Sequence, residues 1–222
     1  MNRYSRILEL STFSQEKLDI LATKKITIIG CGGVGQHFAT YLATNGIKNL
    51  KIVDFDVVEI SNLNRQILLS EKDIGLKKTD VVKRELENRN SECQIESLSI
   101  KIDKTNISEV ILGSDLVIDA VDNWQTKLII SEACKNANIL FFHIGVDGVG
   151  GQFCLFKEKN LFDLVTNEIL SEKRDGVLGP MVGVVSSLAT LHLINYLVGE
   201  HNFVDILYCY KGTTNEIVKI SL

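Results

Sequence analysis

Short continuous hydrophobic runs alternate with amphipathic stretches over the first two thirds of the chain. Continuous apolar runs are typical of parallel strands that helices cover on both faces, and a 3.6-residue period is typical of those helices. Strands are expected at 25–30, 49–56, 94–100, 115–122 and 139–146, and helices at 35–47, 77–90 and 124–138. This alternation predicts an α/β fold with a doubly wound, mainly parallel Rossmann-like sheet and helices on both faces.

The pattern changes after Gly151. An extended run at 151–156 precedes a polar segment, 157–179, which we expect to be a mobile crossover loop. The only proline, Pro180, begins a long apolar helix, and proline favours the first helical position. Two final extended runs, 203–210 and 215–222, predict a hairpin and therefore a C-terminal antiparallel extension of the sheet. We expect one domain over 1–222, with an N-terminal helical arm at 1–22.

Composition narrows the class of protein. Hydrophobic residues make up 45% and charged residues 23%, which is typical of a soluble globular protein. The net charge of −4, without a face-sized cluster of Lys and Arg, disfavours nucleic-acid binding. We expect no membrane span, because charge or glycine interrupts the apolar stretches before ~18 residues, and no signal peptide, because the N-terminus lacks a continuous apolar region. A cytoplasmic protein is therefore expected.

Cysteine and histidine usage argues against a metal centre of the thiolate type. The five cysteines are scattered, form no CxxC pair, and are odd in number, so neither a disulfide framework nor a zinc knuckle is expected. The four histidines show no metal-ligand spacing. His143, near the end of an expected strand, is interpreted as a wall residue rather than a catalytic one.

A glycine-rich turn joins the first expected strand to the first expected helix. Its G-x-G-G-x-G pattern consists of Gly30, Gly32, Gly33 and Gly35. Glycines at such a turn let a phosphate approach the backbone, and the helix N-terminus supplies N–H groups. A tight turn without a ligand is the alternative, and the strand–turn–helix context favours a nucleotide. The motif alone leaves mononucleotide and dinucleotide open.

An acidic residue, Asp54, ends the second expected strand. A carboxylate at this position can accept hydrogen bonds from both ribose hydroxyls, in an NAD enzyme and in an ATP enzyme alike. Asp56 is a weaker candidate for the same role.

Two features distinguish an ATP site from an NAD site: the stretch SNLNRQ, 61–66, and Lys78. A triphosphate carries more negative charge than a dinucleotide, and cations stabilise the transition state of nucleotidyl transfer and the leaving pyrophosphate. Arg65 and Lys78 suit this role, and Asn62 and Asn64 are candidate orienting donors. A solvated lysine at the start of a charged helix is the alternative for Lys78.

Asp122 and Asn123 follow the fourth expected strand, at the edge where ligands of open α/β sheets bind. A carboxylate there can hold Mg²⁺, which prefers oxygen ligands and nucleotide phosphates. Asp119 lies within the strand and is interpreted as structural.

Together these motifs resemble the ThiF/MoeB/HesA family, the bacterial relatives of the adenylation domain of ubiquitin-activating enzymes. The resemblance runs through RYSRI, GCGGVG, DFDVVEISNLNRQ, GLKK, DAVDN and GPMVGVVSSLATLHLINYLVG, in that order. It implies an ATP- and Mg²⁺-dependent adenylyltransferase. Such an enzyme activates the C-terminal carboxylate of a ubiquitin-like sulfur-carrier protein or peptide as an acyl-adenylate and releases pyrophosphate.

The resemblance also implies roles for single residues. Gly33 matches a nucleotide-contacting glycine, Asp54 the ribose-binding aspartate, and Ser61 to Arg65 the phosphate-contacting stretch. Lys78 matches the catalytic lysine, and Asp122 the magnesium-linked aspartate. Arg6 matches an arginine that reaches into the partner's active site in family dimers, which implies a homodimer; a surface charge is the alternative.

The chain departs from the family pattern at two points. It is a short member without the two CxxC pairs that hold structural zinc in many relatives, so no zinc is expected. No cysteine lies between Lys157 and Leu207 to form a covalent link to a carrier. Both absences favour adenylation alone and leave the acyl substrate open. The alternatives are an NAD-dependent oxidoreductase, which SNLNRQ and Lys78 disfavour, and a catalytically inactive nucleotide-binding scaffold.

Overall fold

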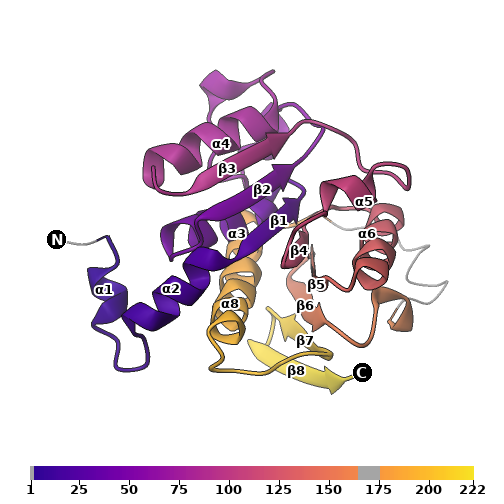
Figure 1. The fold of residues 1–222 in the computed structure, drawn as a ribbon. Coiled ribbons are helices and arrows are strands. Elements are labelled where there is room, and N and C mark those ends of the chain that lie inside the picture. Colours follow the sequence, from indigo (N-terminus) through magenta and orange to yellow (C-terminus); the bar gives the residue numbers. More distant parts are fainter. Residues whose placement is uncertain (1–2, 165–175) are drawn as a thin grey trace.

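One eight-stranded sheet crosses the computed structural model, which describes residues 3–164 and 176–222 (Figure 1). The strand order is β3-β2-β1-β4-β5-β6-β7-β8. Pairing is parallel from β3 to β5 and antiparallel from β5 to β8. The strands are β1 Lys25–Ile29, β2 Asn49–Val53, β3 Gln94–Leu98, β4 Leu116–Asp119, β5 Leu140–Asp147, β6 Gly150–Phe156, β7 Ile206–Lys211 and β8 Glu216–Ser221.

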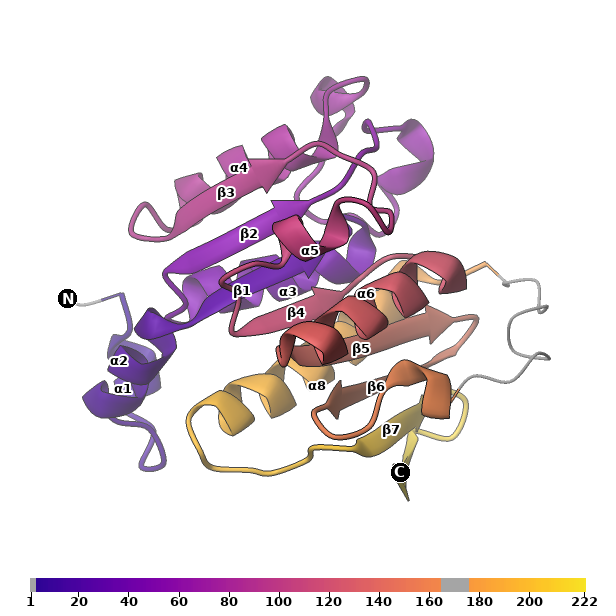
Figure 2. The same ribbon diagram turned by 45° about the vertical axis from the view of Figure 1, so that its right-hand side comes forward.

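Helices cover both faces of this sheet (Figure 2). They are α1 Ser5–Leu8, α2 Gln15–Thr23, α3 Gly33–Thr44, α4 Lys78–Arg89, α5 Ile107–Val110, α6 Trp124–Ala137 and α8 Gly179–Leu197, with 3-10 turns η1 Ile60–Asn62, η2 Glu71–Asp73 and η3 Leu161–Asp163. The apolar sides of α3, α4 and α8 form one buried core with the sheet, and those of α5 and α6 form a second core on the opposite face. The predicted fold class is confirmed.

The strand order reverses direction between β1 and β4, which pair in parallel although they are not consecutive. This is a topological switch point, where the loops after neighbouring strands diverge and leave a crevice. The predicted strands 49–56 and 115–122 end early, at Val53 and Asp119. The chain turns there because the carboxylates of Asp54 and Asp119 accept hydrogen bonds from backbone N–H groups two residues further on.

Helix α8 begins one residue before Pro180, which occupies its first turn as expected. By length and composition alone, α8 is apolar enough to cross a membrane, because it contains no charged residue. Its buried side chains, among them Val185, Ala189 and Leu193, pack into the core with α3 and the sheet. The predicted hairpin is confirmed as β7 and β8.

The predicted crossover loop, 157–179, includes residues 165–175, which lie outside the described part of the chain. Its described beginning forms η3, which the Asn160 side chain caps. Its described end pairs with the β5–β6 turn through the bridge between Gly148 and Val177. The predicted N-terminal arm contains α1 and α2, and α2 buries Leu18 and Leu21.

Candidate active site

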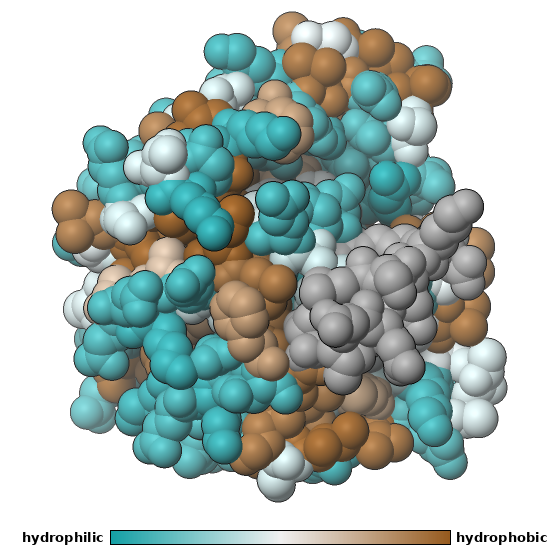
Figure 3. Space-filling view, turned by 90° about the vertical axis from the view of Figure 1, so that its right-hand side faces the viewer, coloured by the Kyte–Doolittle hydropathy of each residue, from teal (hydrophilic) through white to brown (hydrophobic). Residues whose placement is uncertain are grey.

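A cavity of about 760 Å³ lies at the carboxyl end of the parallel strands, a volume typical of ligand sites. Figure 3 faces this edge of the sheet, where hydrophilic and hydrophobic side chains are mixed and hydrophobic ones gather at the top and along the lower edge. The predicted site residues that line the cavity are Gly30, Gly32, Gly33, Asp54, Asn62, Arg65, Lys78, Asp122 and Asn123. The predicted residues that do not line it are Gly35, Ser61, Asn64 and Arg6.

The glycine turn is built by two close backbone approaches. Gly30 has a φ of +105°, and a Cβ placed there would lie 2.5 Å from the carbonyl oxygen of Ala120. A Cβ on Gly35 would lie 1.9 Å from the carbonyl oxygen of Gly30, so Gly35 lets α3 pack directly on the turn. Gly32, by contrast, has nothing within 4 Å of such a Cβ. The turn therefore presents open backbone and the N-terminus of α3 to the cavity.

Asp54 joins the end of β2 to the glycine turn. Its Oδ2 accepts a hydrogen bond from the Cys31 N–H at 2.6 Å, and its Oδ1 accepts one from the Asp56 N–H at 2.8 Å. The side chain is half-buried and lines the cavity. A carboxylate has about four acceptor sites, so Asp54 can still bind two hydroxyl groups.

Lys78 is buried at the first position of α4, yet it lines the cavity. Its Nζ lies 2.8 Å from Asp56 Oδ2, and its backbone N–H donates to the Asp56 carbonyl at 3.0 Å. Asp56 thus anchors the lysine, a role that the sequence analysis did not assign to it. A lysine ammonium has three donors, so this contact leaves donors for a phosphate.

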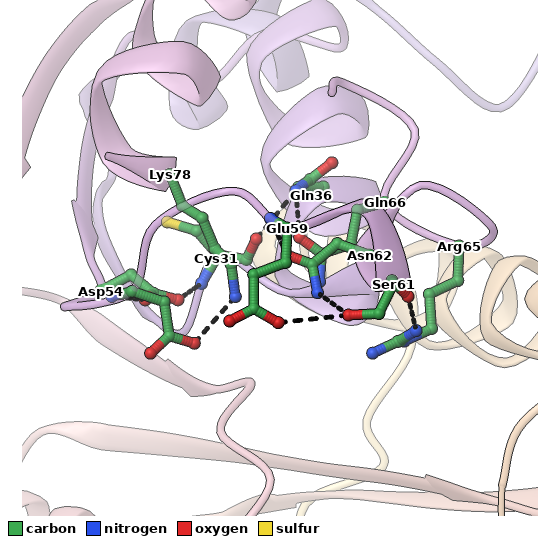
Figure 4. Close-up of polar contacts among 10 residues, drawn as sticks. Cys31, Gln36, Asp54, Glu59, Ser61, Asn62, Arg65, Gln66 and Lys78 are labelled. Carbon is green, nitrogen blue, oxygen red and sulfur yellow. Dashed lines mark hydrogen bonds and ion pairs between the residues drawn. The ribbon is translucent and has the colours of Figure 1, made fainter. Parts of the chain in front are cut away.

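Arg65, Asn62 and Lys78 all line the cavity, and Figure 4 shows Asn62 between Lys78 and Arg65. The Arg65 guanidinium donates to the Ser61 carbonyl and to Asn64 Oδ1, both at 2.9 Å. Asn62 is buried, and its Oδ1 accepts from the Glu59 N–H at 3.0 Å. Asn64 and the Ser61 backbone therefore orient Arg65 without lining the cavity themselves.

The fully buried Gln36 holds the glycine turn against the 61–66 stretch, a role that sequence reasoning missed. Its Nε2 donates to the Cys31 carbonyl at 2.8 Å and to Gln66 Oε1 at 3.2 Å. Its Oε1 accepts from the Leu68 N–H at 2.9 Å. The sequence does carry one signal for this role: a glutamine stands among the apolar positions of α3 that face the core, and a buried polar side chain needs hydrogen-bond partners.

Asp122 follows β4 with its side chain exposed at the cavity and without a hydrogen bond or ion pair to any described residue. Asn123 caps α6, because its Oδ1 accepts from the Thr126 N–H at 2.9 Å. No group of three His, Cys, Asp or Glu in the described chain could hold a metal alone. Protein sites for Mg²⁺ commonly use one or two carboxylates plus substrate phosphates, so the free Asp122 carboxylate fits that ion.

Asp119, at the end of β4, is fully buried beside Lys127 of α6 and His143 of β5. Burial by itself would raise the pKa of Asp119, but the Lys127 ammonium and the His143 hydrogen bond hold that pKa below its ordinary value. This arrangement agrees with the structural interpretation of Asp119. His143 is not among the residues that line the cavity, so it is a buried partner of Asp119 rather than a wall residue.

The cysteines are all free. Burial and the neighbouring Asp54 raise the pKa of the Cys31 thiol far above its ordinary value, with Lys78 opposing them. Burial also raises the pKa of Cys134 to about 12. These thiols stay protonated and unreactive at neutral pH.

Arg6 lies on α1, with its side chain 89% exposed and its Nη1 2.7 Å from Glu9 Oε2. Helix α1 lies at the far side of the molecule from α6 (Figures 1 and 2). Within this chain Arg6 therefore contributes nothing to the cavity.

Residues 4–222 match the family model described as the ThiF family. The chain belongs to the ThiF family. The match spans the glycine turn, the 61–66 stretch, Lys78 and Asp122, and it confirms the predicted family.

Two relatives and one solved structure illustrate the ThiF-family likeness. The chain is 30% identical to the sulfur carrier protein ThiS adenylyltransferase of Escherichia coli (strain K12), over 99% of this chain and 90% of that protein. It is 30% identical to a probable molybdopterin-synthase adenylyltransferase of Porphyra purpurea, over 99% of this chain but only 60% of that protein. The crystal structure of E. coli MccB with ATP superposes with a TM-score of 0.88 at 27% identity, over all of this chain and 71% of that one.

Proposed function

We propose that this ThiF-family chain is an ATP-dependent adenylyltransferase. It activates the C-terminal carboxylate of a ubiquitin-like sulfur-carrier protein or peptide as an acyl-adenylate and releases pyrophosphate. One observation carries the proposal: two cations, Arg65 and Lys78, line the same cavity as the glycine turn and Asp54. The name of the E. coli ThiS relative and the ATP in the MccB structure support it.

Each side chain has a part in this reaction. The glycine turn and the N-terminus of α3 bind phosphate oxygens, and Asp54 accepts hydrogen bonds from the ribose hydroxyls. A carboxylate oxygen of the substrate attacks the α-phosphorus, an O–P bond forms, and the bond to the β-phosphate oxygen breaks. Lys78 and Arg65 stabilise the negative charge of the pentacoordinate α-phosphorus and of the leaving pyrophosphate. Asn62 orients the phosphates from the same wall.

Asp122 would hold Mg²⁺, with the nucleotide phosphates supplying further oxygen ligands. The ion would neutralise phosphate charge at the point where Lys78 and Arg65 also act.

The acyl substrate enters from the β5 side of the cavity. The lining there includes Ile144 and, beyond it, Gly145, Val146, Asp147 and Val177, whose side chains are small or narrow. An extended C-terminal tail fits such a lining better than a bulky side chain does. We place the reaction in the cytoplasm, because free thiols suit a reducing compartment.

We propose further that the enzyme is a homodimer and that Arg6 completes the partner's site. Arg6 does not reach its own cavity, and α8 exposes Val184 and Leu191 beside the exposed Tyr41 of α3. Exposed apolar side chains on neighbouring helices are typical of an interface. Mixing Arg6→Ala with Lys78→Met chains tests this arrangement. Each variant alone should be inactive, and the mixture should regain about a quarter of wild-type activity if sites are shared across a two-fold axis. A mixture as inactive as its components would contradict the shared site.

Pyrophosphate exchange into ATP, with Mg²⁺, tests the adenylation step. We expect exchange that depends on one partner from a panel of sulfur-carrier proteins and short peptides with free C-termini. Lys78→Met should abolish it, whereas Lys77→Met, which removes the exposed neighbouring lysine, should not. ATP binding without exchange for any partner would favour the inactive scaffold. Binding of NAD and not of ATP would favour an oxidoreductase, although no His or Tyr is among the described residues that line the cavity.

A further inference from the structure

We propose that the buried cluster of Asp119, Lys127 and His143 is a positioning device for adenylation, which holds the Asp122 loop and the middle of β5 in place around the cavity. This inference rests on the proposed function. The three residues touch neither the nucleotide nor the acyl substrate, because none of them lines the cavity. They act through the backbone of residues that do.

The contacts of the cluster join the carboxyl end of β4 to the middle of β5. Lys127 Nζ donates to Asp119 Oδ1 at 3.0 Å and to Oδ2 at 2.9 Å, and also to the carbonyl of Ile144 at 3.0 Å. Asp119 Oδ1 accepts from the Val121 N–H at 3.3 Å, and Oδ2 lies 3.0 Å from His143 Nδ1. Val121 and Ile144 both line the cavity. One carboxylate–ammonium pair thus fixes the cavity-lining backbone at Val121, after β4, and at Ile144, in β5.

The fold does not require an ion pair at this place. Removing two charges from water carries a large desolvation penalty, and well-packed apolar residues of similar volume often replace a buried pair without loss of stability. The surrounding core on this face, which includes Ile130, Phe141 and Cys134, is apolar and would accept such residues. A buried pair that also hydrogen-bonds the cavity-lining backbone of Val121 and Ile144 is better explained by orientation of the site than by stability.

Asp122 depends on this orientation more than other site residues do. Asp54, Lys78 and Arg65 each have side-chain contacts that fix them, whereas the Asp122 side chain has none among the described residues. Its position follows from the backbone between Asp119 and the Asn123 cap of α6. Because a misplacement of about 1 Å near reacting atoms can reduce a rate about 10²-fold, a loosened loop should be visible in the turnover rate.

Trp124, the only tryptophan, supplies a readout that does not depend on activity. Its ring stacks on His143, with centroids 5.7 Å apart and an interplanar angle of 27°. It is the first residue of α6, two positions after Asp122. Displacement of the loop should change the emission of Trp124.

The test replaces the pair as a unit, with Asp119→Val and Lys127→Met in one chain. The control is Lys51→Met with Glu96→Val, which removes a partly exposed lysine–carboxylate pair between β2 and β3. Lys51 lies 3.5 Å from Glu96 and donates to the Val110 carbonyl at 3.1 Å, so it makes the same kinds of contact away from the cavity. Both double variants should unfold at temperatures near that of the wild type.

For the Asp119–Lys127 variant we expect pyrophosphate exchange at saturating ATP to fall at least about tenfold, with KM for ATP changed less than about threefold, and a shift in Trp124 emission. The control variant should keep all three wild-type values. His143→Phe, which keeps the ring against Trp124 but removes the N–H donor to Asp119, should lower exchange in the same sense by a smaller factor. If the double variant does not fold, the His143→Phe variant tests the positioning role in its place.

A folded double variant that exchanges at the wild-type rate would overturn the positioning role and leave the proposed function intact. The same conclusion would follow if the His143→Phe chain kept the wild-type rate while the double variant failed to fold. Wild-type protein without any partner-dependent exchange would overturn the proposed function and this inference together.

Discussion

The substitution Gly35→Ala tests the glycine turn with a single methyl group. A Cβ at Gly35 would lie 1.9 Å from the carbonyl oxygen of Gly30. Even a close C···O contact needs about 3.3 Å, so α3 and the turn must separate by more than about 1 Å. The neighbour is backbone at the end of β1 and cannot rotate away as a side chain would.

This displacement should cost both stability and nucleotide binding. Overpacking of this kind typically costs about 1–3 kcal/mol, and each kcal/mol lowers the melting temperature of a domain of this size by about 2–4 °C. The phosphate-binding N–H groups of α3 move with the helix, so a shift of about 1 Å should also reduce activity about 10²-fold.

Thermal unfolding followed by circular dichroism measures the loss of stability. Calorimetric titration of ATP measures the loss of nucleotide binding, and pyrophosphate exchange measures the loss of activity. Gly176→Ala is the matched control, because a Cβ there meets nothing within 4 Å and the residue has no positive φ. The control should melt at the wild-type temperature. A Gly35→Ala chain with wild-type melting temperature and wild-type ATP affinity would refute the close-packing account.

Three further predictions concern charged and titratable groups. Asp56→Asn should lower pyrophosphate exchange about tenfold, because the ion pair with Asp56 positions the Lys78 ammonium, and an unchanged exchange rate would contradict that role. Burial, with His201 and Lys219 nearby, lowers the pKa of His192, so the unfolded chain binds that proton more readily. The stability that the neutral His192 ring contributes is fully present above about pH 6.5 and is lost as the pH falls toward the folded pKa. In urea unfolding, the stability of the wild type relative to His192→Phe should therefore decline from about pH 7.5 to about 5.5. A difference in stability that stays constant over this range would contradict the linkage. Asp73→Asn should cost about 1–3 kcal/mol in urea unfolding, because the buried carboxylate accepts hydrogen bonds from Ser70 and Arg84, and an unchanged midpoint would show that these bonds contribute nothing.

The parallel core of the fold could be predicted because its signal is local. The runs that form β1, β4 and β5 are predominantly apolar, and covered parallel strands need that pattern. The strand ends could not be predicted, because β2 and β4 end where a side-chain carboxylate accepts a hydrogen bond from a backbone N–H group. Helix α5 was missed because it has only four residues, too few to show a period.

The cavity residues were found where a motif borders a strand end, as at Gly30, Asp54 and Asp122. The residues that support them were missed, because their contacts join positions far apart in the sequence. Gln36 meets Gln66 only after α3 packs on the 61–66 stretch. Lys127, in an amphipathic helix, gives no sign in the sequence that it is buried against Asp119.

Oxygen-isotope transfer tests the central claim, formation of an acyl-adenylate, most directly. The partner that supports the fastest pyrophosphate exchange is labelled with ¹⁸O in its C-terminal carboxylate and incubated with ATP, Mg²⁺ and an acyl acceptor. Attack of that carboxylate on the α-phosphorus, followed by breakage of the acyl carbon–oxygen bond, leaves one ¹⁸O atom in AMP. Mass spectrometry should detect labelled AMP in an amount that rises together with the amount of acyl product. Unlabelled AMP, or ADP in its place, would contradict the account.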